Sequence, residues 1–503
     1  MPDSVNQVAG LHPKPATSPS NLIPKVVLTP TQRKFLPLVV AIAIFMQILD
    51  ATILNTALPS IARDLNQPVL SLQWAVISYA LTLAIFMPMS GYLSDKYGTK
   101  KIFLIAIAIF TGGSILCAMA TTLNTLVFSR VIQGLGGALL MPAARLVILQ
   151  AYPRDQILRV MNYAVMPALL GPILGPLIGG YLVELASWHW IFLINVPIGI
   201  IGVVAGMKLL PEFRSYDTDM DWLGFMLFGA AVAFITLSLE FVNEVFNNPK
   251  TGIFALLVAM FGGALMSAYY WHVKNMQDPE TCKNNTAKPL FGLDLFAVRT
   301  FRIGIFGSLF TRLGMGAVPF LLPLLLQVVF GYTPSEAGWM LAPIAIGALI
   351  TKPLVTFLVK NFGYRNVLVG NTIIIGINII LLSQLAPDTP RWLSVLMLGF
   401  MGACNSIQFS SMNTVSLIDL SHEQTSSGNS LVSVTQQLSI SFGIALGSAV
   451  LHLFTPASAT PTEAYSAFSH SFILLGVITI LAGLSFTRLH KNDGMAKVAA
   501  KPA

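Results

Sequence analysis

The chain has 503 residues, of which 55% are hydrophobic and only 10% are charged, and its formal net charge is +8. Soluble proteins contain about 25% charged residues, so this composition excludes a soluble globular protein and predicts an all-α polytopic membrane protein. The basic residues lie beside apolar runs, which argues against a nucleic-acid-binding protein. The three cysteines match no metal or redox spacing, and we expect neither a metal nor a cofactor.

Fourteen apolar runs are long enough to cross a bilayer as helices. Residues 1–34, before the first run, are polar and rich in proline, and we expect a disordered tail there instead of a cleavable signal peptide. The limits of the fourteen runs are 36–58, 74–94, 102–121, 124–149, 160–184, 190–210, 221–241, 251–272, 303–330, 335–357, 366–385, 391–417, 427–452 and 467–488.

The distribution of Lys and Arg predicts the orientation of these helices. With both termini in the cytoplasm, the cytoplasmic segments hold 22 of the 29 basic residues and the outer loops hold three. This asymmetry is a strong positive-inside signal, and it requires an even number of spans.

A shift of 265 residues aligns parts of the two halves of the sequence. The pairs that it aligns are Trp74 with Trp339, Gly98 with Gly363, Gly134 with Gly399 and Gly137 with Gly402. Internal repeats of this kind point to a transporter whose substrate site lies at the repeat interface, near the bilayer midplane. The predicted organisation is a cytoplasmic tail (1–34), a six-helix half (35–211), a two-helix insert (212–275), a cytoplasmic linker (276–302), a second six-helix half (303–488) and a second cytoplasmic tail (489–503).

Asp50 is the one acidic residue that the sequence puts well inside a span. An ionisable group at that depth costs a few kcal/mol or more and is a functional-site hypothesis by default. Counting residues at 1.5 Å each puts Arg130 about 9 Å and Asp50 about 12 Å from the outer ends of their helices. The similar depth predicts an ion pair or a charge relay through water. The alternative for Arg130 is a structural base that binds helix-end carbonyl groups.

The segment Gly91–Lys101 lies between the second and third spans. Gly98 permits a tight turn there, and Asp95 can pair with a base or cap a helix of the other half. Such a contact would hold the inner face closed in one state. The alternative is that the basic residues of this segment only anchor the chain at the cytoplasmic face, as the positive-inside rule predicts.

The fifth run carries glycines at four-residue intervals and two prolines on the adjacent face. The five residues are Gly171, Pro172, Gly175, Pro176 and Gly179. Small faces let helices cross closely, and the prolines remove backbone donors and bend the helix. The pattern fits a conformational change, and a packing groove without a moving part is the alternative.

The sequence puts one acidic residue and several basic residues inside the predicted spans, and this balance of charge disfavours divalent cations as substrates. We expect neutral, monocationic or anionic compounds instead. Candidate substrate contacts are Asn55, Gln133, Arg312, Asn405 and Gln408. There is no Gly-x-x-x-x-Gly-Lys-Ser/Thr motif, so ATP is not the expected energy source.

Four motifs together resemble the major facilitator superfamily, and more narrowly its fourteen-helix drug:proton antiporter branch. They are Asp-x-Thr-Ile-x-Asn-x-Ala-Leu-Pro (50–59), the loop 91–101, the segment 130–138, and the Gly/Pro helix followed by Trp-His-Trp-Ile-Phe-Leu-Ile-Asn (188–195). The resemblance covers about residues 35 to 490. One departure is visible, because Lys360 stands in the second half where the repeat aligns it with Asp95.

The resemblance implies proton-driven export of drugs or small amphipathic compounds across the bacterial inner membrane by alternating access. It assigns coupling to Asp50 and Arg130, gating to the loop with Gly91, Asp95, Gly98 and Lys100, and the conformational change to the Gly/Pro helix. The expected partners are the lipid bilayer, protons and a small-molecule substrate. A transporter of the same fold for one sugar, organic acid or peptide is the first alternative. A membrane-embedded enzyme or sensor is the second, but an enzyme should show clustered His, Asp, Glu or Cys at the midplane.

Overall fold

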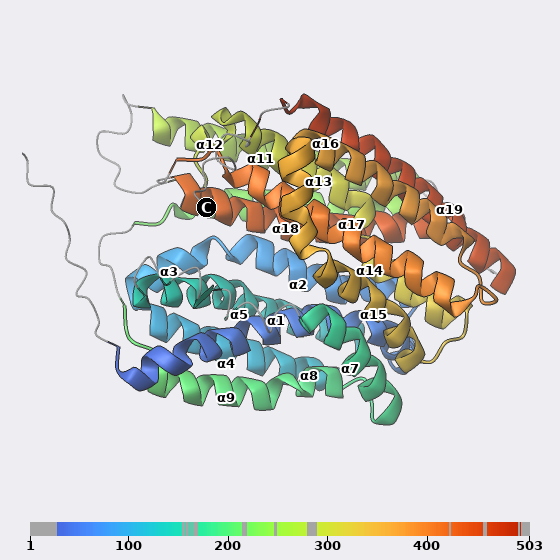
Figure 1. Cartoon of the computed structure of the whole chain (residues 1–503), viewed down its shortest axis with the longest axis horizontal. Helices are drawn as coiled ribbons and strands as arrows, with labels where there is room; N and C mark the ends of the chain where they lie inside the picture. The colour runs from blue at the N-terminus through green and yellow to red at the C-terminus, as the bar shows by residue number, and fades with distance from the viewer. Residues whose placement is uncertain are drawn as a thin grey trace, which may run out of the picture.

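The computed structural model describes residues 28–152, 156, 160–161, 164, 170–213, 219–245, 249–278, 289–421, 424–455, 460–490 and 493. Within these residues the fold is helical (Figure 1). Twelve helical segments are long and apolar enough to cross a membrane, and two shorter apolar helices, Gly171–Leu185 and Pro334–Ile350, lie at the fifth and tenth predicted runs. The class of polytopic helical membrane protein is therefore confirmed.

The helices fall into two groups that lie one above the other in Figure 1. The lower, blue-to-green group contains α1 (Pro30–Asp64), α2 (Gln73–Phe86), α3 (Met89–Tyr97), α4 (Thr99–Ala118), α5 (Leu123–Ala151), α7 (Gly171–Leu185), α8 (Trp190–Leu193) and α9 (Asn195–Leu209). The upper group contains α11 (Pro249–Gln277), α12 (Asp294–Ala297), α13 (Arg299–Met315), α14 (Val318–Leu324), α16 (Lys352–Leu381), α17 (Arg391–Leu417), α18 (Gln424–Phe454) and α19 (Pro461–Ala482). We count α10 (Trp222–Val245) and α15 (Pro334–Ile350) with this group, because α10 packs on α11 and α15 packs on α17.

Helix α1 is longer at both ends than the sequence predicts. It begins at Pro30, where Thr29 and Gln32 form a capping box, so residues 30–34 belong to the helix and not to a disordered tail. It also continues through Pro59 to Asp64. Asp50 therefore lies about 21 Å from the outer end of its helix, at 1.5 Å per residue, and the shorter predicted distance of about 12 Å is wrong. Residues 1–27 lie outside the described residues.

Two glycines that the 265-residue shift aligns both have a positive φ angle. Gly98 has φ 99° between α3 and α4, and Gly363, which is 265 residues later, has φ 75° at a kink inside α16. Positive φ values are accessible to glycine without the steric cost that other residues meet. The same turn thus occurs at both aligned positions.

The two groups of helices are packed together at one end of the molecule. Following the predicted orientation, we call the outer end the one that holds the C-termini of α1 and α7 and the N-terminus of α15. One buried hydrophobic cluster there joins both groups, with Leu58, Phe192, Leu322, Leu341 and Phe472 among its members. Towards the other end, separate clusters serve α1, α4 and α5 and, in the upper group, α16 and α17. The two groups therefore close on each other at the outer end.

Helices α10 and α11 occupy the part of the chain in which the two-helix insert is predicted. They pack on each other, and α10 also contacts α2 of the lower group and α18 of the upper group. A third hydrophobic cluster fills this seam with Met87, Phe228, Val232 and Val432. The pair thus covers the line along which α2 and α18 meet.

Candidate functional site

Asp50 of α1 and Arg130 of α5 form a buried ion pair. Arg130 Nη1 lies 2.7 Å from Asp50 Oδ2, and the side chains are 1% and 0% exposed. Removing two charges from water is costly, and the cost is offset only when good geometry and further hydrogen bonds satisfy both groups. The contact that the sequence analysis considered on grounds of depth is therefore present in the structure.

Both oxygens of the Asp50 carboxylate accept hydrogen bonds from neighbouring helices. Gln133 Nε2 donates to Oδ1 at 2.7 Å, and Asn195 Nδ2 donates to the same oxygen at 3.0 Å. Ser114 of α4 accepts a hydrogen bond from Gln133 Nε2 at 2.7 Å. Four helices, α1, α4, α5 and α9, thus contribute buried polar groups to one hydrogen-bond network, in which Ser114 of α4 is linked to Asp50 through Gln133.

The Arg130 guanidinium is enclosed on its other sides. Its Nε donates to the Ala75 carbonyl at 3.1 Å, and Nη1 donates to Gln133 Oε1 at 2.6 Å. Its carbon Cζ lies 4.1 Å from the centre of the Tyr79 ring, a cation–π contact in a desolvated setting. One backbone carbonyl thus binds Arg130 beside the ion pair, but Ala75 lies in the first turn of α2 and is not one of the helix-end carbonyl groups of the structural alternative.

The sequence analysis missed three members of this network, namely Tyr79, Ser114 and Asn195. Asn195 stands at the end of the Trp-His-Trp motif, where it is the one amide side chain within the predicted run 190–210. An amide inside an apolar run was a signal that could have been used. Nothing comparable marks Tyr79 or Ser114, which only the folded chain brings to Asp50.

We expect Asn195→Ala to destabilise the protein by about 1–3 kcal/mol, because a buried carboxylate oxygen loses one donor. Asp50 keeps its bonds to Arg130 and Gln133, so substrate transport should be reduced but not lost. Thermal unfolding in detergent and transport in vesicles measure the two effects. Asn195→Asp is the contrasting variant, since a second acid beside Asp50 should be more damaging than alanine. An alanine variant as stable as the wild type would contradict this account.

The glycines of α7 pack directly against α1. A Cβ atom at Gly171 or Gly179 would lie 2.6 Å from Ile48 or Thr56, respectively, and one at Gly175 would collide with Thr52. The partner residues recur at the same four-residue interval as the glycines, so two regular helix faces are matched. Thr52 Oγ1 also donates to the Gly171 carbonyl at 3.2 Å. The predicted close helix crossing is thus formed with the helix that carries Asp50.

The other face of α7 contacts the upper group. A Cβ atom at Gly338 of α15 would meet the Pro176 carbonyl, and one at Gly180 would meet the Pro334 carbonyl. Trp339 Nε1 donates to Tyr181 Oη at 2.9 Å. Helix α7 therefore lies between α1 and α15, at the right-hand end of the lower group in Figure 1. Pro172 lies in its first turn.

The loop residues stay within the lower group of helices in this state. Lys100 Nζ donates to the Met207 carbonyl at 2.7 Å, and a Cβ atom at Gly98 would collide with Glu212. No atom of a neighbouring residue lies within 4 Å of the position that a Cβ atom would occupy at Gly91. Asp95 is half-buried at the end of α3 and forms no ion pair or hydrogen bond within the described residues, so the contact suggested for it is not formed here. Burial raises the pKa of Asp95.

The candidate substrate residues have different surroundings. Gln133 belongs to the Asp50 network, and Gln408 is fully buried between α17 and α16, where its Nε2 donates to Thr372 at 2.7 Å. Asn55 is half-buried on α1. Arg312 and Asn405 are mostly buried, and each has a polar atom without a hydrogen-bond partner among the described residues. These two are the candidates with a buried polar atom that lacks a hydrogen-bond partner among the described residues.

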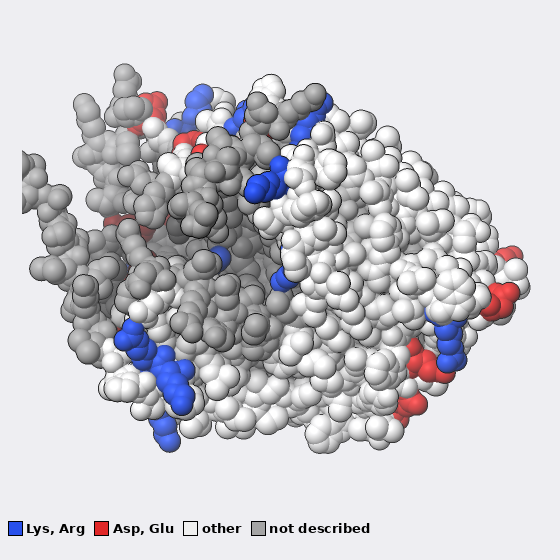
Figure 2. Space-filling model, viewed as in Figure 1, with Lys and Arg blue, Asp and Glu red and all other residues white. Residues whose placement is uncertain are grey.

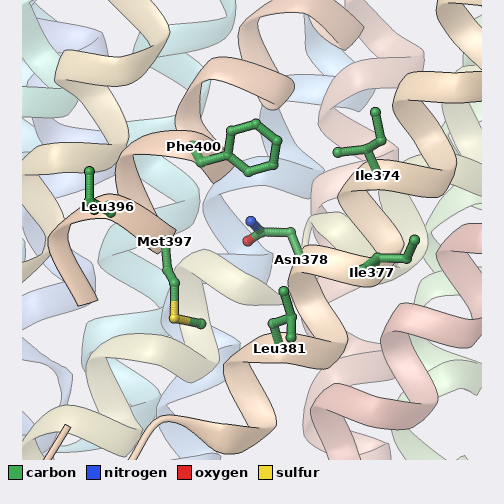
Figure 3. A pocket seen from close by; sticks show the side chains of 7 residues that line it. All are labelled: Ile374, Ile377, Asn378, Leu381, Leu396, Met397 and Phe400. Atoms are coloured by element: carbon green, nitrogen blue, oxygen red, sulfur yellow. The ribbon is translucent and has the colours of Figure 1, made fainter. Parts of the chain in front are cut away.

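An apolar groove between α16 and α17 lies away from these residues (Figure 3). It has a volume of about 330 Å³ and is lined by Ile374, Ile377, Asn378, Leu381, Leu396, Met397 and Phe400. None of the predicted site residues is in that lining. We therefore assign the candidate site to the buried polar residues of the interior and not to this groove.

The charges on the surface suit a protein that crosses a bilayer. In Figure 2 the described basic residues lie mainly to the left and a mixed group of charges lies at the right, while the described surface between them is almost without charge. The same view shows a hollow between the two groups of helices, with Lys or Arg atoms on its wall. Together with the buried ion pair, this arrangement is that of a multi-pass membrane transporter.

Comparison with known sequences identifies the family. The sequence profile of the Major Facilitator Superfamily matches residues 40–274 and 304–502. The chain belongs to the major facilitator superfamily.

Its relatives share about two residues in five over nearly their whole lengths. A transport protein named HsrA from Haemophilus influenzae is 39% identical over 456 residues, which cover 91% of this chain and 96% of HsrA. MdtD from Serratia proteamaculans, whose name refers to multidrug resistance, is 41% identical over 453 residues, which cover 90% of this chain and 92% of MdtD. The similarity to MdtD-type proteins is thus established.

Solved structures agree on the fold. A bacterial homologue of the lysosomal transporter Spinster, in an inward-facing conformation, gives a TM-score of 0.65 at 16% identity and covers 94% of this chain and 100% of its own. A D-xylose–proton symporter gives 0.63 at 15% identity and covers 91% and 98% of the two chains. At these identities the likeness concerns the fold alone.

Proposed function

We propose that this protein is a proton-coupled antiporter that exports drugs or other small amphipathic compounds across the bacterial inner membrane. The observation that carries the proposal is the Asp50–Arg130 pair, held at 2.7 Å with almost no exposed surface. A buried carboxylate whose partners lie on other helices is a group whose protonation changes helix packing. The name of the MdtD relative supports drugs as the substrate class.

In this mechanism the proton acts on the packing of α1. Protonation of Asp50 removes its negative charge, which weakens its attraction for Arg130 and the acceptance of hydrogen bonds from Gln133 and Asn195. Because α7 is fitted to α1 through its glycines and to α15 across the outer end, a shift of α1 is transmitted to the contact between the halves. Binding of a proton from the outside and binding of the substrate from the cytoplasm then favour opposite conformations of the two halves of the transporter.

The same proposal includes the arrangement in the membrane. We propose fourteen spans, in which α7 and α15 are the two short ones and α10 and α11 are the insert between two six-helix halves. The domain limits are those given above, except that the first helix begins at residue 30. Both termini face the cytoplasm, as the positive-inside distribution of the basic residues favours.

The alternative is a transporter of one sugar, organic acid or peptide. The name of the D-xylose–proton symporter shows that this fold also serves metabolite transport, although its low identity does not transfer a substrate. Everted membrane vesicles distinguish the two. Export of several unrelated dyes or drugs in response to an imposed pH gradient supports the antiporter. Movement of a single labelled metabolite with no response to any drug would favour the alternative.

We expect Asp95→Asn to slow turnover without abolishing substrate binding. In this conformation the carboxyl is half-buried and has no ion-pair or hydrogen-bond partner among the described residues. Its raised pKa means that this conformation binds the proton of Asp95 more tightly than a conformation in which Asp95 is exposed. The stabilisation is present below the ordinary pKa of about 3.9 and is lost as the inner pH rises through the raised value. Asparagine at position 95 should keep this conformation populated at neutral pH, and the population of the conformation should then depend less on pH.

Turnover in vesicles and equilibrium binding of the same substrate check this prediction for Asp95→Asn. Lys96→Gln, which changes the exposed neighbour, controls for charge at this end of α3. Loss of binding in the Asp95 variant would argue against a gating role.

A further inference from the structure

Arg312 is a second arginine buried inside the protein, near the middle of a span. It lies 13 residues after the start of the segment Arg299–Val329, which is about 20 Å at 1.5 Å per residue. Its side chain is 6% exposed. A cation at that depth is costly unless a group of opposite charge or several acceptors satisfy it.

The described residues do not satisfy Arg312. Its one hydrogen bond there runs from Nε to Ser308 Oγ at 3.2 Å, and Nη2 is buried without a partner. Its carbon Cζ lies 5.1 Å from the centre of the Phe409 ring. No acidic side chain of the described residues forms an ion pair with it. A guanidinium has five N–H donors in a planar fork, so most of its capacity for an acidic group is unused.

The two halves differ in how they treat a buried cation. In the lower group Arg130 is neutralised by Asp50. The 265-residue shift puts Met315 at the position of Asp50, so the upper group lacks the corresponding acid. The same shift aligns Arg312 with Gln47 of α1, whose Oε1 is also buried without a partner. Unsatisfied polar groups therefore occupy equivalent positions on α1 and α13, at the depth where transporters of repeated halves bind their substrates.

We propose that Arg312 binds the acidic group of an amphipathic anion, a carboxylate or sulfonate attached to an aromatic body, as the transported substrate. This inference rests on the proposed export function and narrows its substrate class. The guanidinium supplies paired donors to the acidic group, and Phe409, which is 43% exposed, offers a ring face to the apolar body.

The test compares two compounds that differ only in charge. The full chain in proteoliposomes is given labelled naphthalene-1-sulfonate, an anion, or naphthalene-1-sulfonamide, which has the same ring system and no charge. We expect Arg312→Gln to reduce pH-driven export of the sulfonate by about 10- to 100-fold and to leave the sulfonamide unchanged. Arg312→Lys should restore part of the sulfonate export. Arg391→Gln removes an exposed cation at the start of α17 and should change neither compound.

The outcomes separate this inference from the proposed function. Equal loss of both compounds in Arg312→Gln, or no loss of either, would overturn the anion site. Wild-type export of the sulfonamide but not of the sulfonate would overturn it as well, while leaving the proton-coupled exporter intact. If the wild type moves no compound in response to the pH gradient, both proposals fail.

Discussion

Asp50→Asn is expected to reduce pH-driven export to the background of vesicles without the protein. The amide cannot carry the negative charge, so Arg130 is left buried without its counter-charge. Breaking a buried ion pair by removing one partner typically destabilises a protein by about 3–5 kcal/mol. Expression and the unfolding temperature should therefore fall together with export, and export must be compared at matched amounts of protein in everted vesicles.

A double variant separates lost coupling from lost stability. Asp50→Asn combined with Arg130→Gln removes both charges, and we expect it to recover most of the stability while export stays at background. Binding of a labelled substrate to the purified double variant verifies that the site is folded. Proton-driven export by either variant at the wild-type rate would show that another group couples transport to the gradient.

Gly338→Leu is expected to hold the two halves apart at the outer end. A Cβ atom at this position already meets the Pro176 carbonyl of α7, and the remaining atoms of leucine would have to enter the same space. Forcing extra methylene groups into a packed contact costs about 1–3 kcal/mol. If that cost falls on the outer-closed state alone, its population relative to the outer-open state drops about 5- to 150-fold.

Labelling from outside measures this shift. A cysteine at Gln327, whose side chain donates to the Thr56 carbonyl at 2.9 Å across the halves, should react faster with an impermeant maleimide in Gly338→Leu. The three native cysteines are replaced by serine in this background. Gly370→Leu is the matched control, since no atom lies within 4 Å of a Cβ position there. An unchanged labelling rate in Gly338→Leu would mean that the contact between α7 and α15 does not decide the state.

The sequence predicted the deep pair but not the rest of its network. An acid in a membrane helix is rare enough to be noticed alone, and the depth of Arg130 suggested it as the partner. The network is completed by Ser114 and Asn195, which are 64 and 145 residues from Asp50 along the chain. Serine and asparagine occur in many membrane helices without a shared role. Asn195 reaches Asp50 directly and Ser114 reaches it through Gln133, and both arrangements depend on the packing of α4 and α9, which no local pattern encodes.

The small face of α7 was predictable, but its partner was not. Glycines at four-residue intervals indicate that another helix packs closely against α7. The face of α1 that contacts these glycines is formed by Ile48, Thr52 and Thr56. These residues have ordinary sizes, so the partner's sequence carries no matching signal. The break between α2 and α3 was also missed, although Pro88 stands at it. Hydropathy continues through the break, and hydropathy was what set the limits of the run.

The enclosure of Asp50 also bears on the energy supply of a resting cell. A carboxylate with no exposed surface cannot exchange its proton with water on either side while its neighbours stay packed. Under the proposed function, a copy of the protein that rests in this conformation does not conduct protons across the membrane. Only copies that complete an export cycle consume the proton gradient. A cell can therefore keep unused exporters in its membrane without losing the gradient through them.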